Sequence, residues 1–342
     1  MTGRAAFEEL HSGTFYLDKD DVPAIQRYLS APGWLQPEES VCAADPAGEG
    51  NMNYTLRIHT TQRSFVLKQA RPWVEKYSHI AAPWDRALVE GGFYRQIESN
   101  RALARKMPSL LGFDPEARVL MLEDAGAAPD FTSIYSERNI RAADLRELLD
   151  YLIALHLAFR DPNIAARFRN MEMRGLNHEH IFALPLRARN GIELDAMTPG
   201  LTKAAEELQN DLVYKEQVAA LGRLYLGDGQ CLIHGDYFPG SWLRTKTGVR
   251  VIDPEFSFFG LPEFDIGVMT AHLHLARVEP GLIDLVRTVY AKAAPLDATL
   301  LDRFAGVEIM RRLIGVAQLS LPYGLDEKRR LLQLARKRVT GR

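Results

Sequence analysis

Acidic side chains in the second half of the chain are suited to moving a phosphoryl group. Asp236 follows a histidine and a glycine in the run LIHGDYFPGS, and the apolar run VRVI ends at Asp253 and Glu255, which flank a proline. A positioned carboxylate can accept the proton of an attacking hydroxyl. Two carboxylates at the end of a strand supply the hard oxygen ligands that Mg²⁺ prefers. Because aspartate is also a common turn residue, each run taken alone fits an ordinary turn as well.

Two neighbouring arginines, Arg311 and Arg312, lie in the run RFAGVEIMRRLIGVAQL. Apolar residues surround the expected helix on nearly every side, so it should be buried. A buried guanidinium requires an anion. The local sequence leaves two partners open: a structural Asp or Glu, or a substrate.

The first half of the chain carries residues suited to binding a nucleotide triphosphate. A glycine-rich turn can cover phosphates with backbone amides, and a lysine on a neighbouring strand, held by a helix glutamate, can neutralise them. Lys68 also fits the alternative of a lysine that protects a sheet edge from aggregation. The candidates are Gly48, Gly50, Asn51 and Asn53 in PAGEGNMNY, Lys68 in SFVLKQA, and Glu90 in WDRALVEGG.

The elements that must position these residues differ between the two halves. Residues 53–60 and 64–70 alternate apolar and polar side chains across a polar TTQR turn, which predicts a β-hairpin. Residues 118–124 predict a buried strand, and residues 84–99 a helix with Asp85 as its N-cap. The first half is therefore expected to be a small sheet with one helix.

Beyond residue 125 the apolar pattern is helical. Two short strand-like runs, 230–234 and 249–255, interrupt it. The basic C-terminal run that begins at Lys328 predicts a solvated helix. The expected helices span 145–159, 205–221, 264–276, 282–293 and 303–319.

Histidines in these runs are expected to have structural roles. His272 and His274 lie two residues apart on one expected helix and point about 200° away from each other, so they cannot share a metal ion. His156 lies on an apolar helix face and predicts a core or loop-bracing side chain. His234 is expected to brace the loop that carries Asp236.

The composition excludes several classes of protein. The chain has 342 residues, of which 46% are hydrophobic and 25% charged, with a net charge of -2. This balance predicts a soluble protein that binds neither nucleic acid nor membrane. The first residues, MTGRAAFEELHSG, lack the apolar segment of a signal peptide, and no run is long enough to span a membrane, so we expect a cytoplasmic protein. Two isolated cysteines, Cys42 and Cys231, indicate neither a zinc site nor a disulfide framework.

Read from the N-terminus to the C-terminus, the motifs resemble those of the aminoglycoside phosphotransferase and choline kinase group of protein-kinase-like enzymes. Within this group they most resemble those of the methylthioribose kinases. The resemblance covers about residues 45–320 and is carried by GEGNMN, SFVLKQARPWV, WDRALVE, LEDAG, HGD followed by GS, DPEFSFFG, FDIG and IMRRLIG. It implies an α+β bilobal fold. Residues 1–124 would form a β-rich nucleotide-binding lobe, and residues 125–342 a helical lobe with the catalytic, metal and acceptor sites.

The resemblance also implies roles for individual residues. It makes Asp236 the catalytic base, places Mg²⁺ on Asp253 and Glu255, and directs Lys68, held by Glu90, to the phosphates of ATP. It further implies main-chain hydrogen bonds from Leu122 and Asp124 to adenine, contacts from Arg311 and Arg312 to the acceptor, and, as in related kinases, a homodimer.

Two departures from the wider pattern concern the segment after Asp236. Ser241 occupies the position of a metal-binding asparagine in most of the group, as it does in methylthioribose kinases, and Glu255 would compensate as an oxygen ligand. The second departure is Phe238 and Pro239, which replace the His-Thr pair of the usual Leu-His-Thr-Gly-Ser run. The resemblance therefore predicts the chemistry but leaves the acceptor open.

The expected activity is transfer of the γ-phosphate of ATP to the anomeric hydroxyl of 5-methylthioribose, a step of methionine salvage, or to a related 5-deoxypentose. One alternative is a kinase for an aminoglycoside, choline or another amino alcohol. It would need an acidic acceptor pocket, which Arg311 and Arg312 argue against. The other alternative is a nucleotide-binding pseudokinase with a regulatory role, which the joint presence of Lys68, Asp236 and Asp253 argues against.

Overall fold

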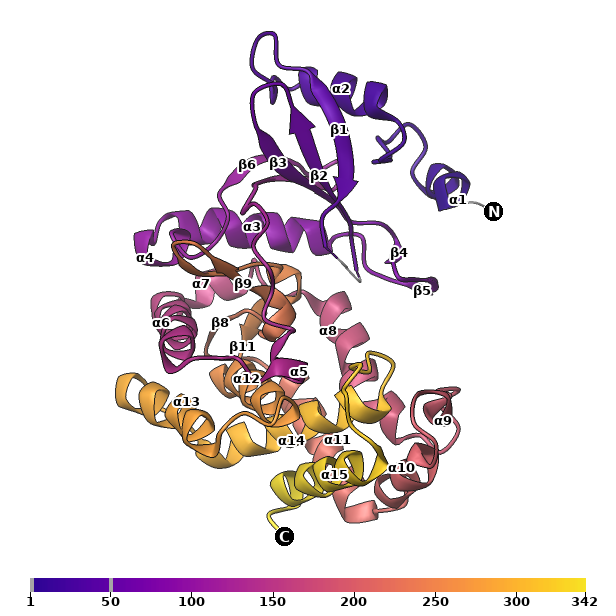
Figure 1. Cartoon of the computed structure of the whole chain (residues 1–342), viewed down its shortest axis with the longest axis vertical. Helices are drawn as coiled ribbons and strands as arrows, with labels where there is room; N and C mark the ends of the chain where they lie inside the picture. Colours follow the sequence, from indigo (N-terminus) through magenta and orange to yellow (C-terminus); the bar gives the residue numbers. More distant parts are fainter. Residues whose placement is uncertain (1–2, 49–51) are drawn as a thin grey trace. The chain divides into compact units, whose positions relative to one another are not determined.

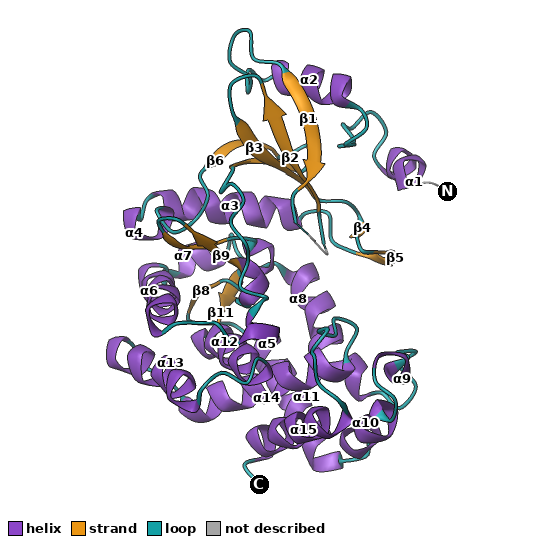
Figure 2. Cartoon of the chain, in the orientation of Figure 1, coloured by secondary structure: helices purple, strands orange, loops and turns teal. Residues whose placement is uncertain are grey.

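The computed structural model describes residues 3–48 and 52–342 and divides into two compact units (Figure 1). The N-terminal unit is Met1–Ala127 and the C-terminal unit is Ala128–Arg342. The first unit contains a five-stranded sheet with helices around it, and the second unit is mostly helical (Figure 2). The functional division expected from the sequence, 1–124 and 125–342, stays a prediction.

A five-stranded antiparallel sheet forms the centre of the N-terminal unit. Its strands are, in spatial order, β1 (Val41–Pro46), β2 (Tyr54–Thr60), β3 (Ser64–Gln69), β7 (Val119–Glu123) and β6 (Leu110–Asp114). The predicted hairpin, β2 with β3, and the predicted third strand, β7, are confirmed. Because β3 lies between β2 and β7, Lys68 is on a central strand, and the edge-strand alternative is wrong.

The two faces of this sheet have different chemistry because side chains alternate along each strand. Phe65 and Leu67 of β3 are fully buried in a core with Ile25 and Leu29 of helix α2 (Val22–Ser30). Lys68 follows Leu67 in the strand, so its side chain lies on the opposite face of the sheet. The sequence did not predict the outer strands β1 and β6 of this sheet. It also did not predict α2, α1 (Gly3–Leu10) or the short elements β4 (Trp73–Val74), β5 (Tyr77–Ala81) and α4 (Arg101–Ala104).

The predicted helix of the N-terminal unit is α3 (Arg86–Glu98), which packs against β6 and β7. Asp85 precedes it in the N-cap position, but the Asp85 side chain makes no capping hydrogen bond. It accepts hydrogen bonds from Arg118 instead, with Nη2 at 2.6 Å. The expected N-cap residue is therefore correct in position and wrong in its side-chain role.

The C-terminal unit is mostly helical, and its long helices pack along one another. Helix α12 contacts α14, and α15 covers α14 in turn. The helices are α5 (Ile134–Glu137), α6 (Ala142–Ala158), α7 (Pro162–Ala165), α8 (Met171–His178), the π-helix η1 (Glu179–Ala183), the 3₁₀-helix η2 (Leu184–Leu186), α9 (Leu194–Met197), α10 (Leu201–Gln209), α11 (Leu212–Leu226), α12 (Pro262–Leu275), α13 (Pro280–Ala293), α14 (Ala298–Ile314) and α15 (Leu325–Thr340).

Three helix predictions need correction. The single helix expected over 205–221 is two helices, because the Asp211 side chain accepts a hydrogen bond from the Tyr214 main-chain nitrogen and caps a new helix there. The helix expected to reach residue 319 ends at Ile314, before Gly315. The basic C-terminal helix is not simply solvated, since one face of it is buried through residues such as Leu331 and Ala335.

Two small antiparallel strand pairs frame the loops that carry the acidic residues. Strand β8 (Cys231–Ile233) pairs with β11 (Phe258–Gly260), and β9 (Trp242–Thr245) pairs with β10 (Gly248–Val251). The sequence predicted β8 and β10 but missed their partners. The loops between them contain the 3₁₀-helices η3 (Pro239–Ser241) and η4 (Pro254–Phe256).

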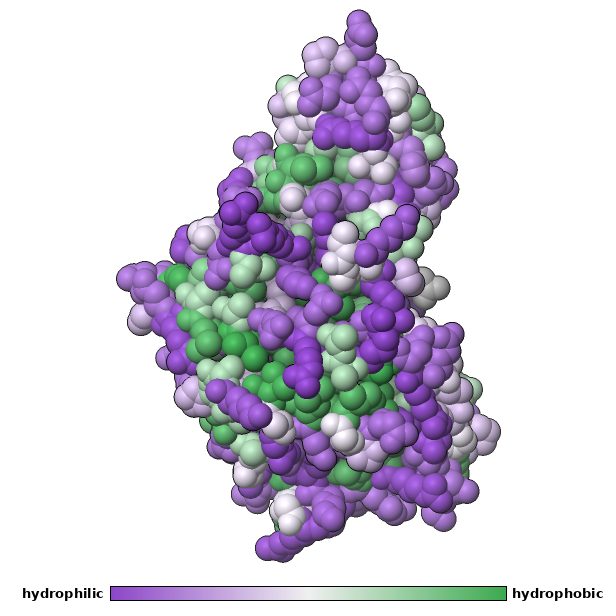
Figure 3. All heavy atoms as spheres, turned by 60° about the vertical axis from the view of Figure 1, so that its left-hand side comes forward, coloured by the Kyte–Doolittle hydropathy of each residue, from purple (hydrophilic) through white to green (hydrophobic). Residues whose placement is uncertain are grey.

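Residues of both hydropathy extremes appear on the surface. Figure 3 shows hydrophilic side chains over much of the visible face, with hydrophobic ones gathered on part of the C-terminal unit. Within residues 3–48 and 52–342, no helix has the length and apolar character needed to cross a membrane.

Candidate active site

The N-terminal unit holds a buried ion pair between its sheet and its helix. Lys68 Nζ lies 2.8 Å from Glu90 Oε1, and the two side chains expose only 4% and 2% of their surface. The central strand supplies the lysine and α3 supplies the glutamate. The structure thus joins two residues that the sequence predicted as partners.

The end of the glycine-rich segment is tied to α3 by a second buried cation. Asn53 Oδ1 accepts a hydrogen bond from Arg86 Nε at 3.0 Å, and Arg86 Nη2 also donates to the Met52 carbonyl at 2.8 Å. Gly48 has a left-handed backbone with φ of 80°. The candidate residues Gly50 and Asn51 lie outside the described residues. Arg86, which the sequence interpretation missed, anchors the base of this segment.

The residues expected to face adenine lie at the end of β7. Leu122 is aligned with Val66 of β3 and Leu110 of β6, inside the sheet. The Asp124 carboxylate accepts hydrogen bonds from Arg57 Nε at 3.0 Å and Ser64 Oγ at 2.7 Å. Its side chain therefore fixes the end of the strand, and the adenine contacts of both main chains stay a prediction.

In the C-terminal unit, Asp265 holds the loop that carries Asp236. Its two oxygens accept hydrogen bonds from the main-chain nitrogens of His234, at 2.7 Å, and Gly235, at 2.9 Å. His156 lies 3.2 Å from the same carboxylate through Nε2, which confirms its loop-bracing role. Gly235 has φ of 85°, and a Cβ there would lie 2.1 Å from the Phe256 carbonyl oxygen, so only glycine fits.

The His234 ring connects this loop to the turn after β10. Its Nε2 lies 2.9 Å from the Ile252 carbonyl oxygen, and its Nδ1 lies 3.4 Å from the Asp236 main-chain nitrogen. Burial lowers the pKa of His234, and the negative charges of Asp265, Asp236 and Asp253 oppose that shift. The predicted bracing role of His234 is confirmed.

The predicted metal ligands lie on this turn and on the adjoining loop. Asp253 has φ of 61°, a left-handed conformation that is strained for a residue other than glycine, and Glu255 is buried. Ser241 Oγ donates to the Asp236 carbonyl oxygen at 3.0 Å, which leaves its lone pairs to accept. Among the described residues no group of three or more His, Cys, Asp or Glu side chains is arranged to hold a metal ion. Two carboxylates and a hydroxyl suit Mg²⁺, which completes its shell with water and phosphate.

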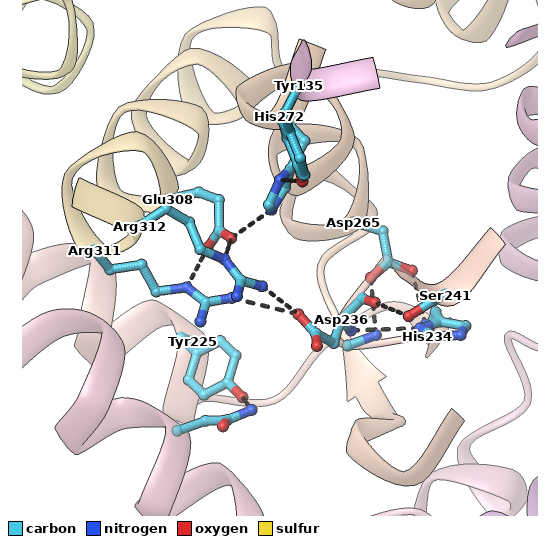
Figure 4. Close-up of polar contacts among 12 residues, drawn as sticks. Tyr135, Tyr225, His234, Asp236, Ser241, Asp265, His272, Glu308, Arg311 and Arg312 are labelled. Carbon is cyan, nitrogen blue, oxygen red and sulfur yellow. Dashed lines mark hydrogen bonds and ion pairs between the residues drawn. The ribbon is translucent and has the colours of Figure 1, made fainter. Parts of the chain in front are cut away.

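Asp236 meets both of the neighbouring arginines (Figure 4). Arg311 Nη2 and Arg312 Nη2 each lie 3.3 Å from the same atom, Asp236 Oδ1. No described residue donates a hydrogen bond to Oδ2, and the Asp236 side chain keeps 19% of its surface exposed. Burial raises the pKa of Asp236, while Arg312 and Arg311 act against that rise. A raised pKa makes the carboxylate a stronger proton acceptor.

Behind the arginines lies a buried chain of polar groups that the sequence interpretation missed. Glu308 accepts hydrogen bonds from Arg312 Nε at 2.8 Å and from Arg311 Nε. His272 Nε2 lies 2.9 Å from Glu308, and Tyr135 Oη lies 2.5 Å from His272 Nδ1. The sequence did contain a signal for Glu308. It precedes Arg311 by three residues and Arg312 by four, a spacing that places all three on one face of a helix. The partner of His272, Glu308, could not be inferred from spacing.

Phe238, the aromatic departure, packs on this network. The Arg312 guanidinium lies over the Phe238 ring at 4.7 Å from its centroid, and the His272 ring centroid lies 5.4 Å away. A Cβ on Gly240 would lie 2.5 Å from the same ring, so the glycine makes room for it. The aromatic ring therefore contacts Arg312 directly.

The N-terminal unit presents a buried lysine–glutamate pair and the C-terminal unit a carboxylate held by two arginines, and both kinds of group occur in phosphotransferases of the protein-kinase-like class. The chain belongs to the phosphotransferase enzyme family, whose model matches residues 44–296.

Curated relatives agree with this family. The methylthioribose kinase of Bacillus pumilus is 27% identical over 336 residues, covering 83% of this chain and 81% of that protein. The methylthioribose kinase of Erwinia tasmaniensis is 29% identical over 283 residues, covering 75% and 66%.

Solved structures share the fold at low sequence identity. A choline kinase from Streptococcus pneumoniae has a TM-score of 0.52 at 14% identity, covering 94% of this chain and 99% of that one. A spectinomycin phosphotransferase in complex with ADP and spectinomycin has a TM-score of 0.53 at 12% identity, covering 93% and 97%. These likenesses confirm the predicted α+β kinase-like fold.

Proposed function

We propose that the protein transfers the γ-phosphate of ATP to a hydroxyl of a small sugar, 5-methylthioribose or a related 5-deoxypentose. The observation that carries this proposal is the state of Asp236. Both arginines hold its Oδ1 atom, while no described residue donates to Oδ2. A carboxylate oxygen in this state is suited to accept the proton of an acceptor hydroxyl.

The reaction proceeds by direct transfer. The acceptor hydroxyl gives its proton to Asp236 as its oxygen bonds to the γ-phosphorus, and the bond from that phosphorus to the β–γ bridging oxygen breaks to release ADP. Mg²⁺ held by Asp253, Glu255 and Ser241 would neutralise negative charge on the phosphate oxygens.

Nucleotide binding is assigned to residues of the N-terminal unit. Lys68, oriented by Glu90, contacts the phosphates, and the backbone around Gly48 covers them. The main chains of Leu122 and Asp124 contact adenine. Gly50, Asn51 and Asn53 belong to the same proposed segment.

Arg311 and Arg312 favour a sugar over a cationic acceptor. Guanidinium groups donate readily to hydroxyl oxygens. The two carboxylates that could attract the cationic group of choline, an amino alcohol or an aminoglycoside are already paired with these arginines. The names of the curated relatives support the same acceptor. An apolar 5-substituent also avoids burying an unpaired hydroxyl, which would cost roughly 1–3 kcal/mol.

An ATP-consumption assay across an acceptor panel tests the proposal. The panel contains 5-methylthioribose, 5-deoxyribose, ribose, choline, ethanolamine and kanamycin, each with Mg²⁺ and after its removal by EDTA. The 5-deoxy sugars should give the highest kcat/KM, with ribose weaker, and EDTA should abolish turnover. If ribose, choline or kanamycin is the best acceptor, the sugar assignment is wrong. If no acceptor is phosphorylated but ATP binds, the pseudokinase alternative gains support.

A cytoplasmic location and a homodimer complete the proposal. Light scattering on the purified protein would measure the oligomeric state.

A further inference from the structure

Glu308 is a buried carboxylate to which the reaction above gives no role. It exposes 1% of its surface, on a helix that is buried almost all round. We propose that Glu308 is a positioning residue: it aims both arginines at one oxygen of Asp236 and so leaves the other oxygen for the acceptor hydroxyl. This inference rests on the proposed function, because it assigns Asp236 the role of base.

The geometry follows from helix spacing. Residues three and four apart lie on one face of a helix, so Glu308 can reach the side chains of both Arg311 and Arg312. Each arginine donates its Nε hydrogen to a different oxygen of Glu308. A guanidinium is planar and rigid, so fixing its Nε also fixes the direction of its Nη2 atom. Both Nη2 atoms then meet Asp236 Oδ1.

Charge balance requires the same carboxylate. The cluster contains two guanidinium groups and two carboxylates, Glu308 and Asp236. Burial would raise the pKa of Glu308, but the charges of Arg311 and Arg312 hold it well below its ordinary value, so it stays ionised. Without this charge, two guanidinium groups would face Asp236 alone. No other described residue accepts from their Nε atoms, so the arginines could turn toward Asp236 Oδ2.

Two further buried groups hold Glu308 itself. Because Glu308 is ionised and only accepts, His272 must carry its proton on Nε2, which leaves Nδ1 to accept from the Tyr135 hydroxyl. Burial lowers the pKa of His272 to about 4, so the ring is neutral near pH 7. The chain from Tyr135 through His272 orients the Glu308 carboxylate, as a second layer of residues often does for reacting groups.

This arrangement defines what remains for the acceptor. In the described part of the chain, neither Arg311 Nη1 nor Arg312 Nη1 has a hydrogen-bond partner. These two donors and the acceptor atom Asp236 Oδ2 match a molecule that presents several neighbouring hydroxyl groups. Glu308 therefore influences acceptor binding and turnover through the arginines, and it should not influence ATP binding.

The test is Glu308→Gln, assayed with the best acceptor of the panel. The two oxygens of Glu308 accept from three donors: the Nε atoms of both arginines and His272 Nε2. Glutamine keeps only one of these oxygens, and its NH₂ group would face at least one of the three donors. We expect kcat/KM for the acceptor to fall by about 10²-fold, as for a misplaced catalytic group, with the KM for ATP changed by less than about 3-fold. The matched control is Glu263→Gln, another buried glutamate, which accepts from the Asp297 main-chain nitrogen and should leave both values near those of the parent.

A double-mutant cycle separates positioning from general stability. If Glu308 acts through the arginines, Glu308→Gln should have a much smaller effect in an Arg311→Met/Arg312→Met background than in the parent. Equal effects in both backgrounds, or parent-like acceptor kinetics of Glu308→Gln, would overturn the inference.

A spectroscopic measurement needs no acceptor and so separates this inference from the proposed function. In the parent, the Nε–H signals of Arg311 and Arg312 should exchange slowly with water in ¹⁵N spectra, because each is bonded to a buried carboxylate. In Glu308→Gln these signals should exchange fast enough to disappear, and in Glu263→Gln they should remain as in the parent. Slow exchange that survives in Glu308→Gln contradicts the inference, whichever acceptor the panel identifies.

Discussion

The two units both bury cations, but they pair them differently. In the N-terminal unit one lysine faces one glutamate, and each side chain exposes 4% or less of its surface. In the C-terminal unit two arginines lie between two carboxylates, and Asp236 keeps 19% of its side chain exposed. A closed pair holds a charge in place, whereas a partly open cluster, in which no described residue donates to Asp236 Oδ2, can react. The difference supports the proposal that the chemical step takes place at Asp236.

The largest expected effect comes from removing the base. Asp236→Asn keeps the size of the side chain but cannot accept the proton, so kcat should fall ~10² to 10⁴-fold. ATP affinity, measured by calorimetry, should stay close to that of the parent. Full activity of this variant would show that Asp236 and its open cluster have only a structural role.

The second prediction concerns the closed pair. Lys68→Met removes the cation that lies 2.8 Å from the buried Glu90 carboxylate, which should lower the free energy of unfolding by about 3–5 kcal/mol and weaken ATP binding. Chemical denaturation and calorimetry measure the two effects. In Lys68→Met/Glu90→Met, stability should largely recover while ATP affinity stays low. Recovery of both would mean that the pair has no contact with the nucleotide.

Much of the N-terminal unit could be predicted from the sequence because its signals are local. Alternation along β2 and β3 and the apolar stripe of α3 already place Lys68 on a strand and Glu90 on a helix. The N-terminal helices were missed, although α2 has local start signals in the capping residue Asp21 and a proline in its first turn.

The cluster of the C-terminal unit was only partly predictable because its contacts join distant segments. Asp236 and Arg312 are 76 residues apart, and Tyr135 and His272 are 137 residues apart. The motifs identified Asp236 and the arginines, but no local pattern relates His272 to either. Strands β9 and β11 were also missed, although they are no shorter than their partners β10 and β8, which were predicted.

The third prediction compares the two arginines. Arg312 is the more buried, with 7% of its side chain exposed against 11% for Arg311, and it also packs on Phe238. Arg311→Met and Arg312→Met should each reduce acceptor kcat/KM by about 10 to 10²-fold, the range for a lost charged hydrogen bond, with little change in the KM for ATP. Arg312→Met should also lower the melting temperature more than Arg311→Met. A larger effect on ATP than on the acceptor would move the arginines to the phosphate side.

The smallest effect is a pH dependence of stability from neutral histidines of the C-terminal unit. Burial lowers the pKa of His272 and of His274 to about 4, from an ordinary value of 6.5. Between pH 6.5 and 4 the unfolded chain therefore binds more protons at these residues than the folded one. Stability should fall as the pH falls through this window, by up to about 1.4 kcal/mol per pH unit for each histidine. His272→Gln should remove one such contribution from the slope measured by denaturation at several pH values, and His272→Gln/His274→Gln should remove both. A slope unchanged in the double variant would mean that carboxylates alone govern acid unfolding, and that His272 does not stay neutral behind Glu308 as the cluster requires.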